Sequence, residues 1–112
     1  MLPIKVFSDI ICSSIQIDDS KFAGNIFLDG IRSSTCIFNN NTINNNFRLK
    51  NSNSDYIKFF NNILKGSIIE LSQNKIQGDL TFFKTKCEHE LSLTDASVQN
   101  NLSFNECEVQ GN

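Results

Sequence analysis

A short phrase of alternating apolar residues recurs about every eleven residues along the whole chain. It reads apolar, variable, apolar, two variable residues, small, variable, apolar, and it is clearest in residues 80–87, 91–98 and 102–109. The leading apolar pairs are Ile4/Val6, Ile15/Ile17, Ile26/Leu28, Thr35/Ile37, Phe47/Leu49, Ile57/Phe59, Ile69/Leu71, Leu80/Phe82, Leu91/Leu93 and Leu102/Phe104. A fixed short period of this kind is typical of solenoids, in which one small unit stacks on its neighbours.

Successive phrases alternate in kind, so the full repeat is 22 residues. The second members of the odd-numbered pairs are Val6, Leu28, Leu49, Leu71 and Leu93, and those of the even-numbered pairs are Ile17, Ile37, Phe59, Phe82 and Phe104. Two phrases therefore form one coil, with a mostly Leu column and a column that runs to Phe. The repeat predicts one domain, residues 1–112, of about five coils, and the 112-residue chain has no room for another.

The alternation within each pair indicates strands, because side chains two residues apart share one face of a strand. No stretch carries the apolar stripe of a helix. Turn-forming positions precede the pairs at Ser13, Gly24, Ser33, Asn45, Asp55, Gly66, Gly78, His89, Asn100 and Gly111. Small residues follow at Ser20, Asn40, Ser52, Asn62, Asn74, Thr85, Ala96 and Cys107, where stacked Asn or Ser can hydrogen-bond between coils. We therefore predict an all-β fold, a right-handed parallel β-helix.

Two segments carry a family resemblance. Residues 78–82 (Gly-Asp-Leu-Thr-Phe) and 100–104 (Asn-Asn-Leu-Ser-Phe) resemble the repeat of pentapeptide-repeat proteins. That resemblance implies a four-sided right-handed β-helix and, for most members, a non-catalytic role. Residues 69–76 are also similar to half of a leucine-rich repeat, but the eleven-residue recurrence leaves no room for the other half, so we rank this second.

The composition indicates the cellular location of the protein and the state of its cysteines. No run approaches the ~18 apolar residues of a membrane span, and residues 1–7 lack the basic-then-apolar pattern of a signal peptide. We expect a cytoplasmic protein with no membrane partner, although secretion by a signal-independent route stays open. Of the four cysteines, Cys87 and Cys107 occupy inward sites, where a thiol behaves as a small hydrophobe, so reduced cysteines are expected.

Charge is unevenly distributed although the net charge is only −2. Residues 32–86 contain eight basic and three acidic residues, and residues 87–112 contain five acidic and no basic residues. Lys84 and Lys86 precede Glu106 and Glu108 by one coil, so each pair should stack as an exposed ion pair worth ~0–1 kcal/mol. Alternatively, the negative C-terminal region steers a basic partner.

Catalytic and metal-binding patterns are not apparent. His89 is the only histidine and occupies a turn position, and a metal site would need several converging ligands. There is no phosphate-binding loop and no Ser-His-Asp spacing with a meaning we can assign. We expect no enzyme activity, no cofactor and no metal. DNA mimicry, which occurs among pentapeptide-repeat proteins, needs a strongly acidic rod. Because basic residues outnumber acidic ones in residues 32–86, a nucleic-acid-related role is not expected.

The most suggestive surface feature is aromatic. Phe38, Phe60 and Phe83 each follow an inward pair and lie about one coil apart. If strand alternation continues, they point outward as a stripe, and a contiguous exposed apolar surface usually marks a contact site. If the corners rotate them inward, they form a second layer of core. Both interpretations are open, and the three residues are the candidate partner-binding site.

The leading functional hypothesis is a non-enzymatic repeat scaffold that binds another protein. Residues 109–112 repeat residues 98–101 and stop before another apolar pair, which favours a piece of a longer solenoid over end-to-end assembly or an end covered by a partner. Self-assembly into filaments, as in the Gly-richer bactofilins that the chain weakly resembles, is the second hypothesis. A small carbohydrate-binding or carbohydrate-processing β-helix is the third.

Overall fold

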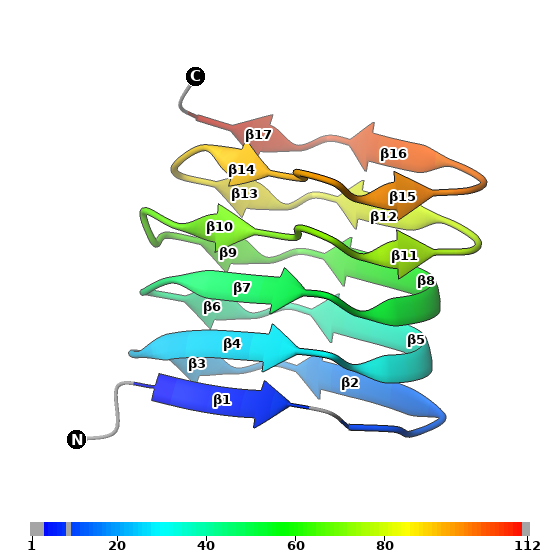
Figure 1. Ribbon diagram of the computed structural model, residues 1–112. Coiled ribbons are helices and arrows are strands. Elements are labelled where there is room, and N and C mark those ends of the chain that lie inside the picture. Colours follow the sequence, from blue (N-terminus) through cyan, green and yellow to red (C-terminus); the bar gives the residue numbers. More distant parts are fainter. Residues whose placement is uncertain (1–3, 9, 111–112) are drawn as a thin grey trace.

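The computed structural model describes residues 4–8 and 10–110, and this part of the chain contains strands, bends and no helix. The strands pair in parallel with strands about 22 residues away and form a β-solenoid of about four turns. The chain crosses the near face in one direction and the far face in the other as it climbs, so the winding is right-handed (Figure 1). The predicted fold class is confirmed, with about four turns in place of five. The expectations for residues 1–3 and Gly111 lie outside the described residues.

Three stacks of parallel strands form the walls. The first contains β1 (Ile4–Ser8), β4 (Asn25–Asp29), β7 (Phe47–Lys50), β10 (Ile69–Glu70) and β14 (Leu91–Ser92). The second contains β2 (Ser14–Asp18), β5 (Arg32–Asn39), β8 (Asn53–Phe60), β11 (Lys75–Ile76), β12 (Leu80–Phe83), β15 (Ser97–Val98) and β16 (Leu102–Asn105). The third contains β3 (Lys21–Phe22), β6 (Thr42–Ile43), β9 (Ile63–Leu64), β13 (Lys86–Cys87) and β17 (Glu108–Val109).

The second wall changes shape along the axis. The single strand β8 pairs with both β11 and β12, which a bend at Gly78 separates. Two residues lie between the inward residues Ser54 and Ile57, whereas three lie between the corresponding Ile76 and Leu80. The extra residue turns a continuous strand into two strands. Gly is required at the bend, because a Cβ on Gly78 would lie 2.6 Å from the carbonyl oxygen of Asp55.

The core contains the two predicted columns, together with the other inward apolar residues of the three walls. In the first, Leu28 pairs with Leu49, and the Leu71 N–H donates to the Ser92 carbonyl oxygen, which sets Leu93 over Leu71. The backbone of β1 places Phe7, not the predicted Val6, opposite Leu28. The second column is a stack of parallel rings whose neighbouring centroids are 4.7, 4.9 and 4.7 Å apart: Phe38, Phe59, Phe82 and Phe104.

As in β1, the register of β5 differs from the prediction by one residue. The inward residues of β5 are Cys36 and Phe38, both buried, whereas the predicted Thr35 and Ile37 are half-exposed. A one-residue shift in register moves every side chain of a strand to the opposite face. Here the stack on Phe59 selects Phe38 for the interior.

The corners also differ from the prediction. Most of the predicted turn positions, such as Gly66 and Gly78, lie at bends, whereas Ser33 and Asp55 lie inside strands β5 and β8. Neither Gly66 nor Gly78 has left-handed backbone. A Cβ on Gly66 would clash with the Asn45 carbonyl oxygen, so this glycine permits close approach between turns. The left-handed residues are Asp19, Gly30, Asn40, Asn51, Asn61, Gln73, Lys84, Asp95 and Glu106, each directly before a small-residue position or its equivalent.

The small-residue positions form hydrogen-bonded ladders, as predicted, with Asn41 in place of the predicted Asn40. The Asn41 N–H and Nδ2 donate to Asn62 Oδ1 at 3.0 and 3.1 Å, and Asn62 Nδ2 donates to the Phe38 carbonyl oxygen at 2.8 Å. At the opposite corner the Ser52 N–H donates to Asn74 Oδ1 at 3.0 Å. These side chains satisfy the backbone groups that the corners turn inward.

Candidate functional site

The three predicted phenylalanines do not form one outer stripe. Phe38 is 2% exposed and belongs to the core stack, so for this candidate partner-binding residue the inward interpretation is correct and the outward one is wrong. Phe60 and Phe83 do lie together on the outer side of β8 and β12, half-buried, with ring centroids 6.2 Å apart and planes at 73°. In this outer column Asn39 stands beside Phe60 and Asn105 beside Phe83. We call Phe60 and Phe83 the aromatic pair.

Cationic and apolar side chains flank the aromatic pair. The Lys84 Nζ lies 5.3 Å from the centroid of the Phe83 ring, a cation–π geometry. Past the left-handed corner after Phe60, the exposed Ile63 lies on the outer side of β9 in register with Lys86. This side of the solenoid therefore presents apolar groups edged by lysines.

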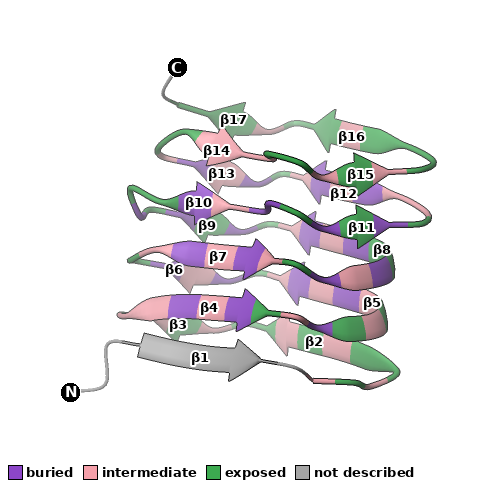
Figure 2. Ribbon diagram, in the orientation of Figure 1, coloured by how far each residue is buried: buried purple, intermediate pink, exposed green. Residues whose placement is uncertain are grey.

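The last described turn is the other exposed apolar region. Leu102, Phe104 and Val109 are 48%, 45% and 47% exposed, whereas their counterparts one turn earlier are buried. The contrast between the purple middle and the green last turn is visible in Figure 2. One face of the Phe104 ring stacks on Phe82, with 1° between the planes. No described turn lies beyond β16 and β17.

Ion pairs link neighbouring turns. Arg48 Nε is 2.7 Å from Glu70 Oε1, and the Ser72 hydroxyl donates to Glu70 Oε2 at 2.6 Å. The Ser72 hydrogen bond, followed by the Arg48 charge, holds the pKa of Glu70 below its usual value despite some burial. The predicted Lys86–Glu108 pair is present at 4.0 Å. The predicted Lys84–Glu106 pair is not among the ion pairs of the described residues.

The residues that sequence analysis considered for chemistry are His89 and the four cysteines. His89 is exposed in the bend between β13 and β14, as predicted for a turn residue. All four cysteines are unpaired, and burial, with a smaller effect of Cys107, raises the pKa of Cys87 to about 12. Among the described residues, no three His, Cys, Asp or Glu side chains are grouped closely enough to hold a metal ion. Nor does this part of the chain contain a helix long and apolar enough to cross a membrane.

A polar groove that sequence reasoning missed lies along the corner after the first wall. It has a volume of about 280 Å³. Its lining residues are all polar or glycine: Gly30, Arg32, Asn51, Ser52, Asn53, Gln73 and Lys75. The available signal was the spacing of Arg32, Asn53 and Lys75, which are about one coil apart and therefore share a column.

Comparisons with protein-family models, curated proteins and solved structures give no match.

Proposed function

We propose that the chain is a non-enzymatic binding module, a rigid β-solenoid that presents fixed side chains to a protein partner. The observation that carries the proposal is the aromatic pair, in which two neighbouring turns place Phe on the outer side of a strand. The adjacent outer column of the same wall is mostly polar, with Lys58, Thr81 and Ser103 in successive turns. Phe is enriched in protein interfaces, and a half-exposed ring gains contact area at little entropic cost.

The rigidity of the scaffold supports this role. The core stack and the corner ladders hold the outer positions at the spacing of neighbouring strands, about 4.8 Å. A binding surface that is ordered before association loses less conformational entropy on binding. The lysines beside the aromatic pair favour a partner whose apolar contact is edged by acidic groups.

We also propose a relationship to the pentapeptide-repeat proteins. In the turns where β11 and β12, or β15 and β16, are separate strands, each coil has four strand segments, in line with the four-sided coil of that family. The residues that carry the resemblance, 78–82 and 100–104, are at this bend.

The test uses the double variant Phe60→Ser/Phe83→Ser, because Phe38 belongs to the core and its replacement would destabilise the fold. We expect the double variant to fold, with a thermal midpoint close to that of the wild type, and to be more soluble. A photo-crosslinking amino acid at Phe60 should yield one discrete protein adduct. Excess unlabelled wild-type protein should compete for the partner and reduce the amount of adduct, whereas excess double variant should not.

Lys58→Ser/Thr81→Ala is the matched control, since it changes the neighbouring outer column of the same two strands. It should compete as well as the wild type. Unfolding of the double variant, absence of an adduct, or equal competition by both variants would contradict a contact role for the aromatic pair.

Self-assembly is a second candidate function, favoured by the exposure of Leu102, Phe104 and Val109 in the last described turn. A strand at the edge of a sheet presents unpaired N–H and C=O groups, and another strand can pair with them. A turn supplied by a second copy of the chain would extend the sheets and cover the exposed rings. Phe104→Glu should abolish this docking, because it would place a charge against an apolar face.

Sedimentation velocity over a range of protein concentrations tests self-assembly. We expect the sedimentation coefficient of the wild type to rise with concentration and that of Phe104→Glu to stay constant. Ile68→Glu, at an exposed apolar site away from the last turn, is the control and should behave like the wild type. A wild-type coefficient that does not change with concentration would refute this candidate.

A further inference from the structure

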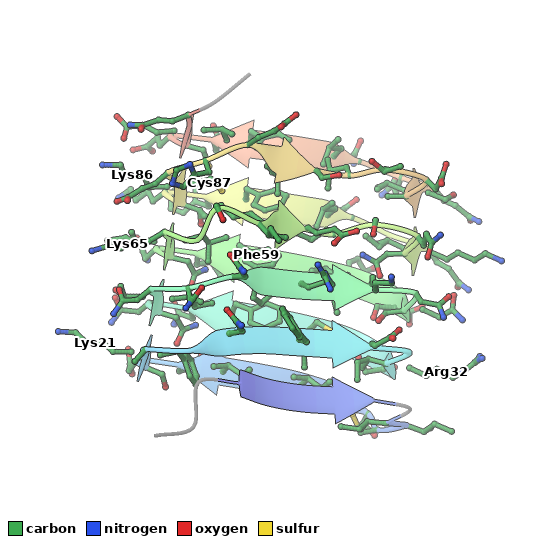
Figure 3. The ribbon with its side chains drawn as sticks, turned by 60° about the vertical axis from the view of Figure 1, so that its left-hand side comes forward. Lys21, Arg32, Phe59, Lys65, Lys86 and Cys87 are labelled. Atoms are coloured by element: carbon green, nitrogen blue, oxygen red, sulfur yellow. The ribbon has the colours of Figure 1, made fainter. Side chains whose placement is uncertain are left out.

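The polar groove is a second potential binding site, at the opposite end of the second wall from the aromatic pair: Asn53 begins β8 and Phe60 ends it. Figure 3 shows Arg32, one of its cations, projecting on the side opposite Lys21 and Lys65. The two cationic side chains that line the groove, Arg32 and Lys75, are both exposed. The groove therefore joins two accessible positive charges to a set of amide side chains.

The register of the strands fixes the spacing of the two cations. Arg32 of β5 pairs with Asn53 of β8, which pairs with Lys75 of β11. Neighbouring strands are about 4.8 Å apart, so the backbones of Arg32 and Lys75 are separated by roughly 10 Å, with Asn53 midway. An extended ligand along the solenoid axis would meet a cation, an amide and a second cation in turn.

The other wall of the groove is built by the left-handed corner residues. Gly30, Asn51 and Gln73 have φ values of 69°, 58° and 58° and occupy equivalent places in successive turns. The Asn51 and Gln73 side chains are exposed and offer both donors and acceptors. Gly30 has no side chain, which leaves the end of the groove beside Arg32 open.

Acidic residues surround the groove without lining it. Asp29 directly precedes Gly30, Asp55 follows Asn53 by two residues, and Asp95 occupies the corner one turn beyond Gln73. None of these three is among the lining residues. The charges on the walls themselves are both positive, and the surrounding carboxylates disfavour non-specific binding of large polyanions.

We propose that this groove binds an acidic oligosaccharide. One sugar carboxylate pairs with the Arg32 guanidinium and a second with the Lys75 ammonium, while hydroxyl groups between them exchange hydrogen bonds with Asn51, Asn53 and Gln73. Hydroxyls donate and accept, as side-chain amides do, which makes the two surfaces complementary. No aromatic ring lines the groove, and single-stranded nucleic acids rely on base stacking on such rings.

The experiment titrates the full chain with a tetramer of α-1,4-linked galacturonic acid, followed by isothermal calorimetry and amide NMR shifts. We expect saturable binding that weakens with added salt, and shifts confined to the amides of the groove. The fully methyl-esterified tetramer, which lacks the carboxylates, should bind much more weakly. Arg32→Gln/Lys75→Gln should lower the affinity about tenfold for each cation removed, since a hydrogen bond to a charged group contributes that much or more.

Lys21→Gln/Lys65→Gln is the matched control, because it removes the same charge from exposed sites on the opposite side. It should bind like the wild type. The proposal is overturned if the tetramer does not bind, if its methyl ester binds equally well, or if the control loses as much affinity as the groove variant. Tighter binding of an oligoglutamate peptide or a short oligothymidylate would show that the ligand class is wrong.

Discussion

At the scale of the residue, side-chain amides hold neighbouring turns together. Asn62 is 1% exposed, and its Oδ1 accepts two hydrogen bonds from Asn41 while its Nδ2 donates to the Phe38 carbonyl oxygen. Asn41 repeats the pattern one turn earlier, since its Oδ1 accepts from the Ser20 N–H and its Nδ2 donates to the Ile17 carbonyl oxygen. No buried side-chain N or O atom of the described residues lacks a partner. The ladder thus supplies the hydrogen bonds that the corner backbone would otherwise make with water.

We predict that Asn62→Ala destabilises the fold by about 2–4 kcal/mol, because it leaves buried backbone and amide groups without partners. Urea denaturation gives the free energy of unfolding. The adjacent Asn61→Gly is the control: Asn61 is exposed and left-handed, a conformation that Gly adopts easily, so its effect should be within about 1 kcal/mol. Equal effects of the two substitutions would mean that the ladder adds little stability.

At the scale of the element, strand pairing places complementary groups side by side. Arg48 of β7 and Glu70 of β10 are register partners, which brings the guanidinium to the carboxylate. The Arg48 guanidinium also lies 4.8 Å from the centroid of the Phe27 ring, in the preceding turn. One planar side chain thus connects three successive strands of the first wall, β4, β7 and β10.

This ion pair predicts a pH dependence of stability. Ser72 and then Arg48 lower the pKa of Glu70 in the fold, so the carboxylate form stabilises the native state. That contribution is complete above the ordinary carboxyl pKa of 4.5 and is lost as the pH falls through the lower pKa of the folded state. Because both side chains are partly exposed, its size should be about 1 kcal/mol or less.

Glu70→Gln should remove this part of the pH dependence, whereas Glu90→Gln removes a charge without altering the Arg48 pair. Thermal midpoints of the wild type and both variants, measured between pH 7 and about pH 3, test this expected difference in pH dependence. Identical pH profiles for the two variants would exclude a special contribution from Glu70.

At the scale of the whole molecule, stability is concentrated in the middle of the solenoid. Each turn packs only on its neighbours, so end turns have fewer partners. All fully buried apolar residues among the described residues lie between Ile26 and Cys87. Beyond them, the last described turn exposes Phe104 and the residues beside it. In the stack that begins at Phe38, the rings of Phe59 and Phe82 are therefore shielded from solvent, and the ring of Phe104 is exposed to it.

Hydrogen exchange should show this gradient. Amides of β7, β8 and β9 should open only with a free energy close to that of global unfolding, while those of β16 and β17 should open with a free energy lower by about 2 kcal/mol or more. Exchange is measured at a concentration at which sedimentation shows a monomer. Uniform protection from β7 to β17 would show that the solenoid unfolds as a single unit.

The regular part of the repeat was predictable from the sequence because its signal is local. In segments such as Leu80–Phe83 only one of the two alternating sets of residues is apolar throughout, so strand, period and inward face follow directly. The column of Phe59, Phe82 and Phe104 was predicted correctly for that reason. Of the candidate site, Phe60 and Phe83 lie on the outer side, which is one of the two placements that the sequence left open.

The inward face of residues 35–38 was predicted wrongly. The predicted inward pair was Thr35 and Ile37, although Cys36 and Phe38 are the only alternating set there that is apolar throughout. In the fold, Phe38 stacks on Phe59, a residue 21 positions away, and this packing fixes Cys36 and Phe38 as the inward set. The polar groove, likewise, exists only because strand register aligns Arg32 with Lys75 across two turns. Alternation along the chain thus determined that this protein is a parallel solenoid, and packing between turns determined which side chains it buries and which it presents.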